Sequence, residues 1–159
     1  MPLRTALPLI LVGCLALAAP PLVRNASATA AAVTPSPGKF LGTTSRAQET
    51  VHLTVSRRHD ITEMSFLLFY RCPDGYRNFQ AVIVPITSGN LLAVIRGTFN
   101  RSWHGTYYQG ATSGSYSDKV AGSFPSAKRA TGTIALTLDR AGHGQCTSGT
   151  VSWTARRVP

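Results

Sequence analysis

Apolar and polar residues alternate along much of this chain beyond residue 38, and this period of two limits its possible folds more than any other feature. In residues 49–56, one face holds Val51, Leu53 and Val55 while the residues between them are polar. Alternation of this kind is typical of a half-buried strand, because successive side chains of a strand point to opposite sides. The same pattern recurs in residues 61–72, whose apolar face holds Met64, Phe66, Leu68, Tyr70 and Cys72.

Further short strands are predicted over residues 79–86, 91–99, 103–108, 119–124, 131–138 and 150–156. Turn-forming residues separate them, and residues 110–118 read as a polar loop rich in glycine and serine. Beyond the N-terminal segment, no stretch has the periodicity of a helix of ten or more residues. We therefore predict an all-β domain, either an antiparallel β-sandwich or a small β-barrel of about 8–9 short strands.

The first 28 residues are predicted to be a secretory signal peptide. A single positive charge at Arg4 precedes an apolar run over residues 6–19, and the small residues Ala26-Ser27-Ala28 suit cleavage by signal peptidase. Two alternatives remain open: a lipid anchor attached through Cys14, and an uncleaved membrane anchor. Prolines interrupt the apolar run, which is shorter than the roughly 20 residues of a membrane span. We expect a secreted protein with no transmembrane helix in the mature chain.

The composition of the residues after the predicted signal peptide divides them into a linker and a domain. Residues 29–38 are rich in alanine and proline and are predicted to be a linker. Residues 39–158 are enough for one β-domain with one core and too few for two ordinary domains.

Cys72 and Cys146 remain in the mature chain once Cys14 is removed. An isolated cysteine pair in an oxidising compartment is far more often a disulfide than a metal or redox site. A bridge between them would close a loop of 74 residues.

The mature chain is strongly basic, since removal of Arg4 and Arg24 leaves 14 Lys and Arg against 6 Asp and Glu, a net charge of +8. Such a surface favours an anionic partner such as a cell-envelope polymer, although charge also keeps a secreted protein soluble. The basic residues look scattered along the chain. The adjacent pairs are Arg57-Arg58, Lys128-Arg129 and Arg156-Arg157. No basic helix or aromatic-basic repeat marks a nucleic-acid reader, so no dedicated nucleic-acid binding is expected.

The chain contains few reactive groups, and we predict that it is not an enzyme. A pair of catalytic carboxylates for glycoside hydrolysis would have to come mainly from Glu49 and Glu63. A solvent-exposed strand face explains the presence of these two residues equally well. The four histidines show no metal-ligand spacing, and no dinucleotide or phosphate-binding glycine motif occurs. We expect no metal and no cofactor. A hydrolase would need His104 or His143 to lie near a serine and an aspartate in the fold.

One aromatic stretch, between Phe99 and Tyr116, suggests a binding surface. Aromatic side chains interleaved with hydrogen-bonding groups suit sugar rings or protein contacts, although strand-borne aromatics also serve as core. The candidate binding residues are Arg101, Trp103, His104, Tyr107, Tyr108 and Tyr116.

Several motifs resemble a family of small exported single-disulfide β-domains of actinobacteria. They are Gly38-Lys39-Phe40-x-Gly42-x-Thr44, the strand Val51-x-Leu53-x-Val55, the strand from Phe66 to Cys72, Gly122-x-Phe124, Ala130-x-Gly132-Thr133-Ile134, and Gly144-x-Cys146-x-Ser148-Gly149-Thr150-Val151-x-Trp153-x-Ala155. The resemblance spans nearly all of residues 38–157. It implies a β fold, the disulfide and an exported bacterial setting. The family has no assigned activity, so no catalytic residue is transferred.

The leading hypothesis is a non-enzymatic exported β-domain that binds an envelope polymer or a protein at the cell surface. The alternative is a small-ligand carrier with a barrel like that of a lipocalin or avidin. These two differ in whether the large residues Phe66, Leu68, Tyr70 and Trp153 fill the centre or line a cavity. A protease inhibitor or effector acting through the loop at Cys72-Pro73-Asp74-Gly75 is a further possibility.

Overall fold

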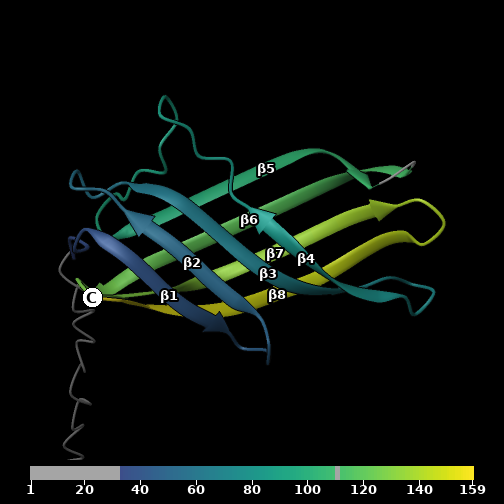
Figure 1. Ribbon diagram of the computed structural model, residues 1–159, viewed down its shortest axis with the longest axis horizontal. Coiled ribbons are helices and arrows are strands. Elements are labelled where there is room, and N and C mark those ends of the chain that lie inside the picture. The colour runs from purple at the N-terminus through teal and green to yellow at the C-terminus, as the bar shows by residue number, and fades with distance from the viewer. Residues whose placement is uncertain (1–32, 110–111) are drawn as a thin grey trace, which may run out of the picture. The chain divides into compact units, whose positions relative to one another are not determined.

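Eight antiparallel strands and no helix make up residues 33–109 and 112–159, the part of the chain that the computed structural model describes (Figure 1). The all-β prediction is therefore confirmed. The strands are β1 (Gly38–Thr44), β2 (Thr50–Val55), β3 (Ile61–Arg71), β4 (Arg77–Ile83), β5 (Thr98–Gln109), β6 (Thr112–Ser126), β7 (Arg129–Arg140) and β8 (Gly144–Arg157).

The strands form one continuous sheet in the order β4-β3-β2-β1-β8-β7-β6-β5. Two four-stranded meanders, β1–β4 and β5–β8, are joined where β1 pairs with β8. β3 also reaches β8, through the pair Arg71 and Thr147, so the sheet folds back on itself. Figure 1 shows β1–β4 crossing over β5–β8 at an angle. This is the strand order of an up-and-down barrel in which, among the described strands, β4 and β5 do not pair.

The core lies between the two meanders. Trp153 of β8 contacts Phe66 edge-on and Phe99 in a tilted geometry, at ring-centroid distances of 5.9 and 6.1 Å. Gly122 and Gly132 make room for it, because a Cβ at either position would lie within 2.8 Å of the indole. The predicted core faces of β2 and β3 are buried as expected. Phe66, Leu68, Tyr70 and Trp153 are all at most 3 % exposed and so fill the centre.

The disulfide between Cys72 and Cys146 is confirmed. It joins the residue after β3 to the start of β8, with the two Cα atoms 4.0 Å apart. Closing a loop of 74 residues removes roughly 4 to 5 kcal/mol of unfolded-state entropy in the loop-closure model. The bond thus supports the place where the sheet folds back.

Three sequence expectations need correction. The predicted loop at residues 110–118 is largely strand, because β6 begins at Thr112 and pairs with β5 on one side and β7 on the other. The predicted strand at residues 91–99 is mostly an irregular connection; Leu92 is buried but makes only an isolated bridge to Ile61. The segment 79–86, expected to be central, is an edge strand that ends at Ile83.

The predicted signal peptide and Cys14 lie outside the described residues. Residues 33–37, at the end of the predicted linker, contact the domain: Ser36 N donates to Ala127 O at 2.7 Å, and Pro35 is buried. Within residues 33–109 and 112–159, no helix is long and apolar enough to cross a membrane.

Candidate functional site

Three of the predicted binding residues meet on the inner face of the second meander. Trp103 of β5 is the cross-strand partner of Asp118, which in turn pairs with Leu136 of β7. Tyr116 and Tyr107 lie on the same face, two and four pairs further along the ladder. The three aromatic side chains line a cavity of about 200 Å³ that also contacts β4.

The other three predicted residues do not join this cavity. The Arg101 guanidinium donates to Pro85 O at 2.5 Å and to Asn90 Oδ1 at 2.8 Å, so it holds the connection between β4 and β5. His104 is exposed, next to Trp103 on the opposite face of β5. The side chain of Tyr108 lies outside the described part of the structure.

Two tyrosine side chains in the cavity wall lie over glycines. A Cβ at Gly105 would lie 2.7 Å from Tyr116 Oη, and a Cβ at Gly114 would lie 2.7 Å from the Tyr107 ring. These glycines are the cross-strand partners of the same tyrosines. Aromatic rings that cover strand glycines in this way pin the strand register.

Asp118 is the residue of this cavity that the sequence analysis missed. The sequence places it at the end of the predicted loop over residues 110–118, but it lies within β6 and is only 4 % exposed. Its Oδ1 atom is buried without a hydrogen-bond partner. Removal from water raises the pKa of Asp118 from its ordinary 3.8 to about 7. The alternation Tyr116, Asp118, Val120 was the available signal, because it places all three on one face of a strand.

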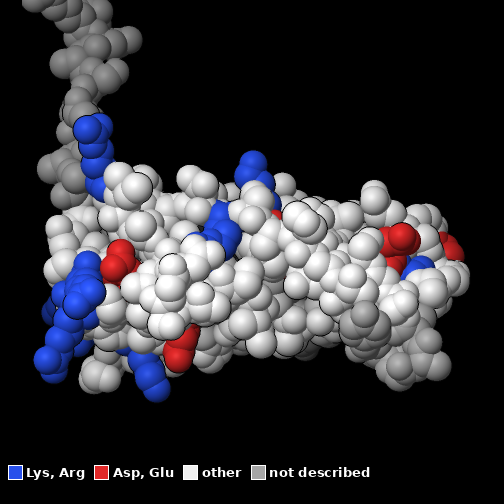
Figure 2. Space-filling model, turned by 90° about the horizontal axis from the view of Figure 1, so that it is seen from above, with Lys and Arg blue, Asp and Glu red and all other residues white. Residues whose placement is uncertain are grey.

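The second feature is a basic end, formed by eight exposed side chains: Lys39, Arg57, Arg58, Arg96, Lys128, Arg129, Arg156 and Arg157. The three basic pairs that look scattered in the sequence meet here. Gly38 pairs with Val55, which precedes the turn carrying Arg57 and Arg58. Arg129 pairs directly with Arg156. Arg157 N donates to Lys128 O at 2.9 Å. Figure 2 shows Lys and Arg side chains gathered at the left of the view.

Few acids balance this end. Asp60 follows the turn that carries Arg57 and Arg58, and Glu63 lies on the outer face of β3, bonded to Thr54. Neither of the ion pairs found in the described residues involves the basic end, since they join Arg46 to Glu49 and His143 to Asp74. The eight positive charges therefore face solvent largely unneutralised.

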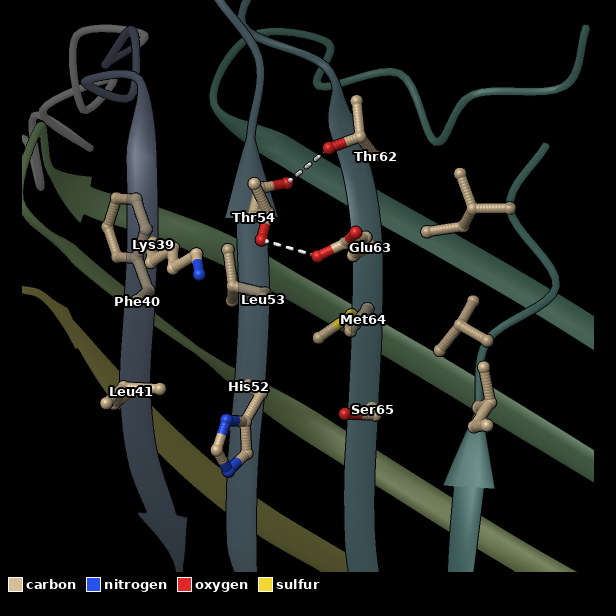
Figure 3. A pocket seen from close by; sticks show the side chains of 13 residues that line it. Lys39, Phe40, Leu41, His52, Leu53, Thr54, Thr62, Glu63, Met64 and Ser65 are labelled. Carbon is tan, nitrogen blue, oxygen red and sulfur yellow. Dashed lines mark hydrogen bonds between the residues drawn. The ribbon is translucent and has the colours of Figure 1, made fainter. Parts of the chain in front are cut away.

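A groove of about 360 Å³ lies on the outer face of β1–β3 (Figure 3). It is bordered by the exposed apolar side chains of Leu41 and Ile83, which are 44 % and 74 % exposed. Two polar side chains in the groove are hydrogen-bonded to each other, since Thr54 Oγ1 donates to Glu63 Oε2 at 3.0 Å. The groove thus lacks a buried orphan group like that of Asp118.

The candidate carboxylate pair for glycoside hydrolysis is not assembled. Glu49 is completely buried, where it accepts hydrogen bonds from Phe69 N at 2.8 Å and from the Thr44 hydroxyl. Glu63 is exposed on the outer face instead. Glu49 therefore fastens the β1–β2 turn to β3.

His143 does meet an aspartate, at the end of the sheet opposite the basic end. Its Nδ1 lies 2.6 Å from Asp74 Oδ2, and its ring stacks on the Tyr76 ring with the two ring centroids 4.2 Å apart. The hydrogen bond to His143 holds the pKa of Asp74 below its usual value. This contact links the β3–β4 turn to the β7–β8 turn beside the disulfide. Within the described part of the chain, no group of three or more His, Cys, Asp or Glu side chains could hold a metal ion.

Comparison with known proteins gives no relative: no protein-family model, no curated protein and no solved structure matches this chain.

Proposed function

We propose that this protein is an exported, non-enzymatic β-domain that binds an anionic polymer of the cell envelope through its basic end. The observation that carries the proposal is the gathering of all three basic pairs, 57–58, 128–129 and 156–157, at one end of the sheet. The resemblance to small exported single-disulfide domains of actinobacteria supports the same setting.

Cross-strand pairing of like charges supports an anionic partner. Arg129 and Arg156 are directly opposite each other on β7 and β8, an arrangement that disfavours the pairing when no anion is present. Neighbouring strands lie about 4.8 Å apart, well within the Debye length of about 10 Å at 0.1 M salt. The positive potentials of these side chains therefore add, and a polyanion would relieve the repulsion.

A hydrated polymer fits this end better than a lipid bilayer. Membrane-surface binding needs an apolar face alongside the charges. Of the exposed large apolar side chains in the described residues, Ile95 adjoins Arg96 in sequence and Leu41 is the cross-strand partner of Arg156, so the basic end carries two separate apolar side chains and no continuous apolar face. The basic residues instead lie on separate turns and at the ends of β1, β7 and β8, a spread that suits a chain with repeated phosphate or carboxylate groups.

The test is co-sedimentation of the mature, oxidised protein with purified cell walls, with and without their teichoic acid, over a range of NaCl concentrations. The variant R57Q/K128Q/R156Q removes three charges from the basic end. The matched control R71Q/R77Q/K119Q removes three exposed charges elsewhere on the sheet. We expect the first variant to lose at least about tenfold in affinity and the control to stay near wild type, with binding weakening as salt rises.

Equal weakening of both variants would reduce the effect to net charge and contradict the proposal. Absence of wild-type binding to walls would contradict it as well. Retention on vesicles of anionic phosphatidylglycerol, without retention on walls, would mean that the basic end binds a membrane surface and not a wall polymer.

A further inference from the structure

The structure contains two buried carboxyl groups with opposite environments. Glu49 is fully buried, and each of its oxygens accepts a hydrogen bond from the protein. Asp118 is almost as buried, yet its Oδ1 has no partner. Since buried polar groups in folded proteins are nearly always hydrogen-bonded, an orphan acceptor in a cavity calls for a partner from outside the chain.

Among the described residues, no donor of the surrounding strands bonds Asp118 Oδ1. Asp118 is paired with Trp103 on one side and with Leu136 on the other, so its neighbours in the sheet present an indole and an alkyl side chain. Gln80 reaches the cavity from β4, but its Nε2 donates to Ala81 O at 3.0 Å. The carboxyl group therefore faces a space lined mainly by aromatic and apolar side chains, with Gln80 at the β4 side.

The cavity lies at the seam where β4 and β5 leave the sheet open. Two backbone groups of β4 are hydrogen-bonded there by side chains of the same strand. Phe79 N donates to Asn78 Oδ1 at 2.8 Å, and Ala81 O accepts a hydrogen bond from Gln80 Nε2. The edge of β4 is thus partly satisfied without pairing to β5, and the seam stays open. Ala81 and Ile83 line the cavity and are exposed, so the cavity reaches solvent at β4.

We propose that this cavity binds a small amine that carries one ring, with its ammonium group donating to Asp118 Oδ1 and its ring packed among Trp103, Tyr107 and Tyr116. The site is separate from the basic end and does not depend on the polymer proposal.

Size and chemistry select this class of ligand. An apolar cavity of about 150 Å³ accepts benzene, so about 200 Å³ accommodates one ring with a short substituent. A cation keeps the carboxylate ionised and makes a charge-assisted hydrogen bond, which is about twice as strong as a neutral one. The faces of Trp and Tyr rings also attract cations. An anionic ligand would instead be repelled by Asp118.

The test uses benzylamine as the probe and two ligands of matched shape, benzyl alcohol and benzoate, at pH 8. Binding is followed by two-dimensional NMR of the oxidised full-length mature protein, through the indole N–H signals. Trp103 lines the cavity, whereas Trp153 is buried in the core and serves as an internal reference. We expect benzylamine to shift the Trp103 signal, with benzyl alcohol at least about tenfold weaker and benzoate inactive.

The variant D118N should weaken benzylamine about ten- to a hundredfold, the effect of losing a hydrogen bond to a charged group. The control E63Q removes an acid from the outer face and should leave benzylamine binding unchanged. An unchanged Trp153 signal verifies that D118N is folded. Equal benzylamine affinity in wild type and D118N, stronger binding of benzyl alcohol, or no shift of Trp103 at millimolar benzylamine would each overturn the proposal.

Discussion

The substitution D118N should raise the free energy of unfolding at neutral pH, because it removes a carboxyl group whose ionisation opposes folding. Below pH 3.8 the carboxyl is neutral in both the folded and the unfolded chain. Between pH 3.8 and about 7 it ionises when the chain unfolds but stays protonated in the fold. Wild-type stability therefore falls through that window and does not fall further, on this account, above about pH 7.

The size of the effect follows from the width of the window. At 1.36 kcal/mol per pH unit, the interval from 3.8 to about 7 corresponds to about 4 kcal/mol. This is a large part of the 5–15 kcal/mol of a typical domain. With a urea m-value of about 2 kcal/mol/M, it shifts the midpoint by about 2 M.

The assay is urea unfolding of the oxidised wild type and of D118N, followed by circular dichroism at pH 4, 5.5, 7 and 8.5. The difference in unfolding free energy between the two proteins should grow by about 4 kcal/mol from pH 4 to pH 8.5, with little of that increase above pH 7. The control D139N makes the same chemical change at an exposed position. Parallel stability profiles for wild type and D118N would refute the reasoning, because they would mean that Asp118 ionises equally easily in the fold.

Three further outcomes are expected. The double substitution C72S/C146S should cost roughly 4 to 5 kcal/mol of stability in urea unfolding, from the lost closure of the 74-residue loop. The substitution G132A should cost about 1–3 kcal/mol or more, because the new Cβ would lie 2.0 Å from Ala121 O and 2.7 Å from Trp153; G89A, with open space around it, should change stability by at most about 0.5 kcal/mol. The intact mass of the exported protein should correspond to cleavage after Ala28, whereas a lipid on Cys14 or an uncleaved N-terminus would give distinct masses.

The sequence predicts most clearly those strands whose two faces have opposite environments. β2 and β3 have a core on one side and solvent on the other, so their alternation is directly visible. The first half of β6 was missed because glycine and serine usually mark loops. Its continuous pairing with β5, joined from Tyr116 onward by pairing with β7, overrides that local preference.

The candidate sites depend on which strands become neighbours, and one-dimensional patterns do not contain that information. Trp103, Tyr107 and Tyr116 were identified because aromatic residues cluster in the sequence. The basic end was not, because residues 57, 128 and 156 meet only after β1 pairs with β8. Glu49 and Asp118 look alike as isolated acids, and only the fold distinguishes the satisfied one from the orphan.

The pairing of β1 with β8 has a consequence for the order in which the chain can fold. Each meander can form by local hairpins, but the partner of β1 is the last strand to be made. Roughly 100 residues separate the end of β1 from the start of β8, which at about 5–20 residues per second is a delay of about 5–20 s. During that interval Phe66 has no Trp153 to pack against, so the N-terminal meander waits with its apolar face open. A truncation that removes β8 would leave the chain permanently in that state.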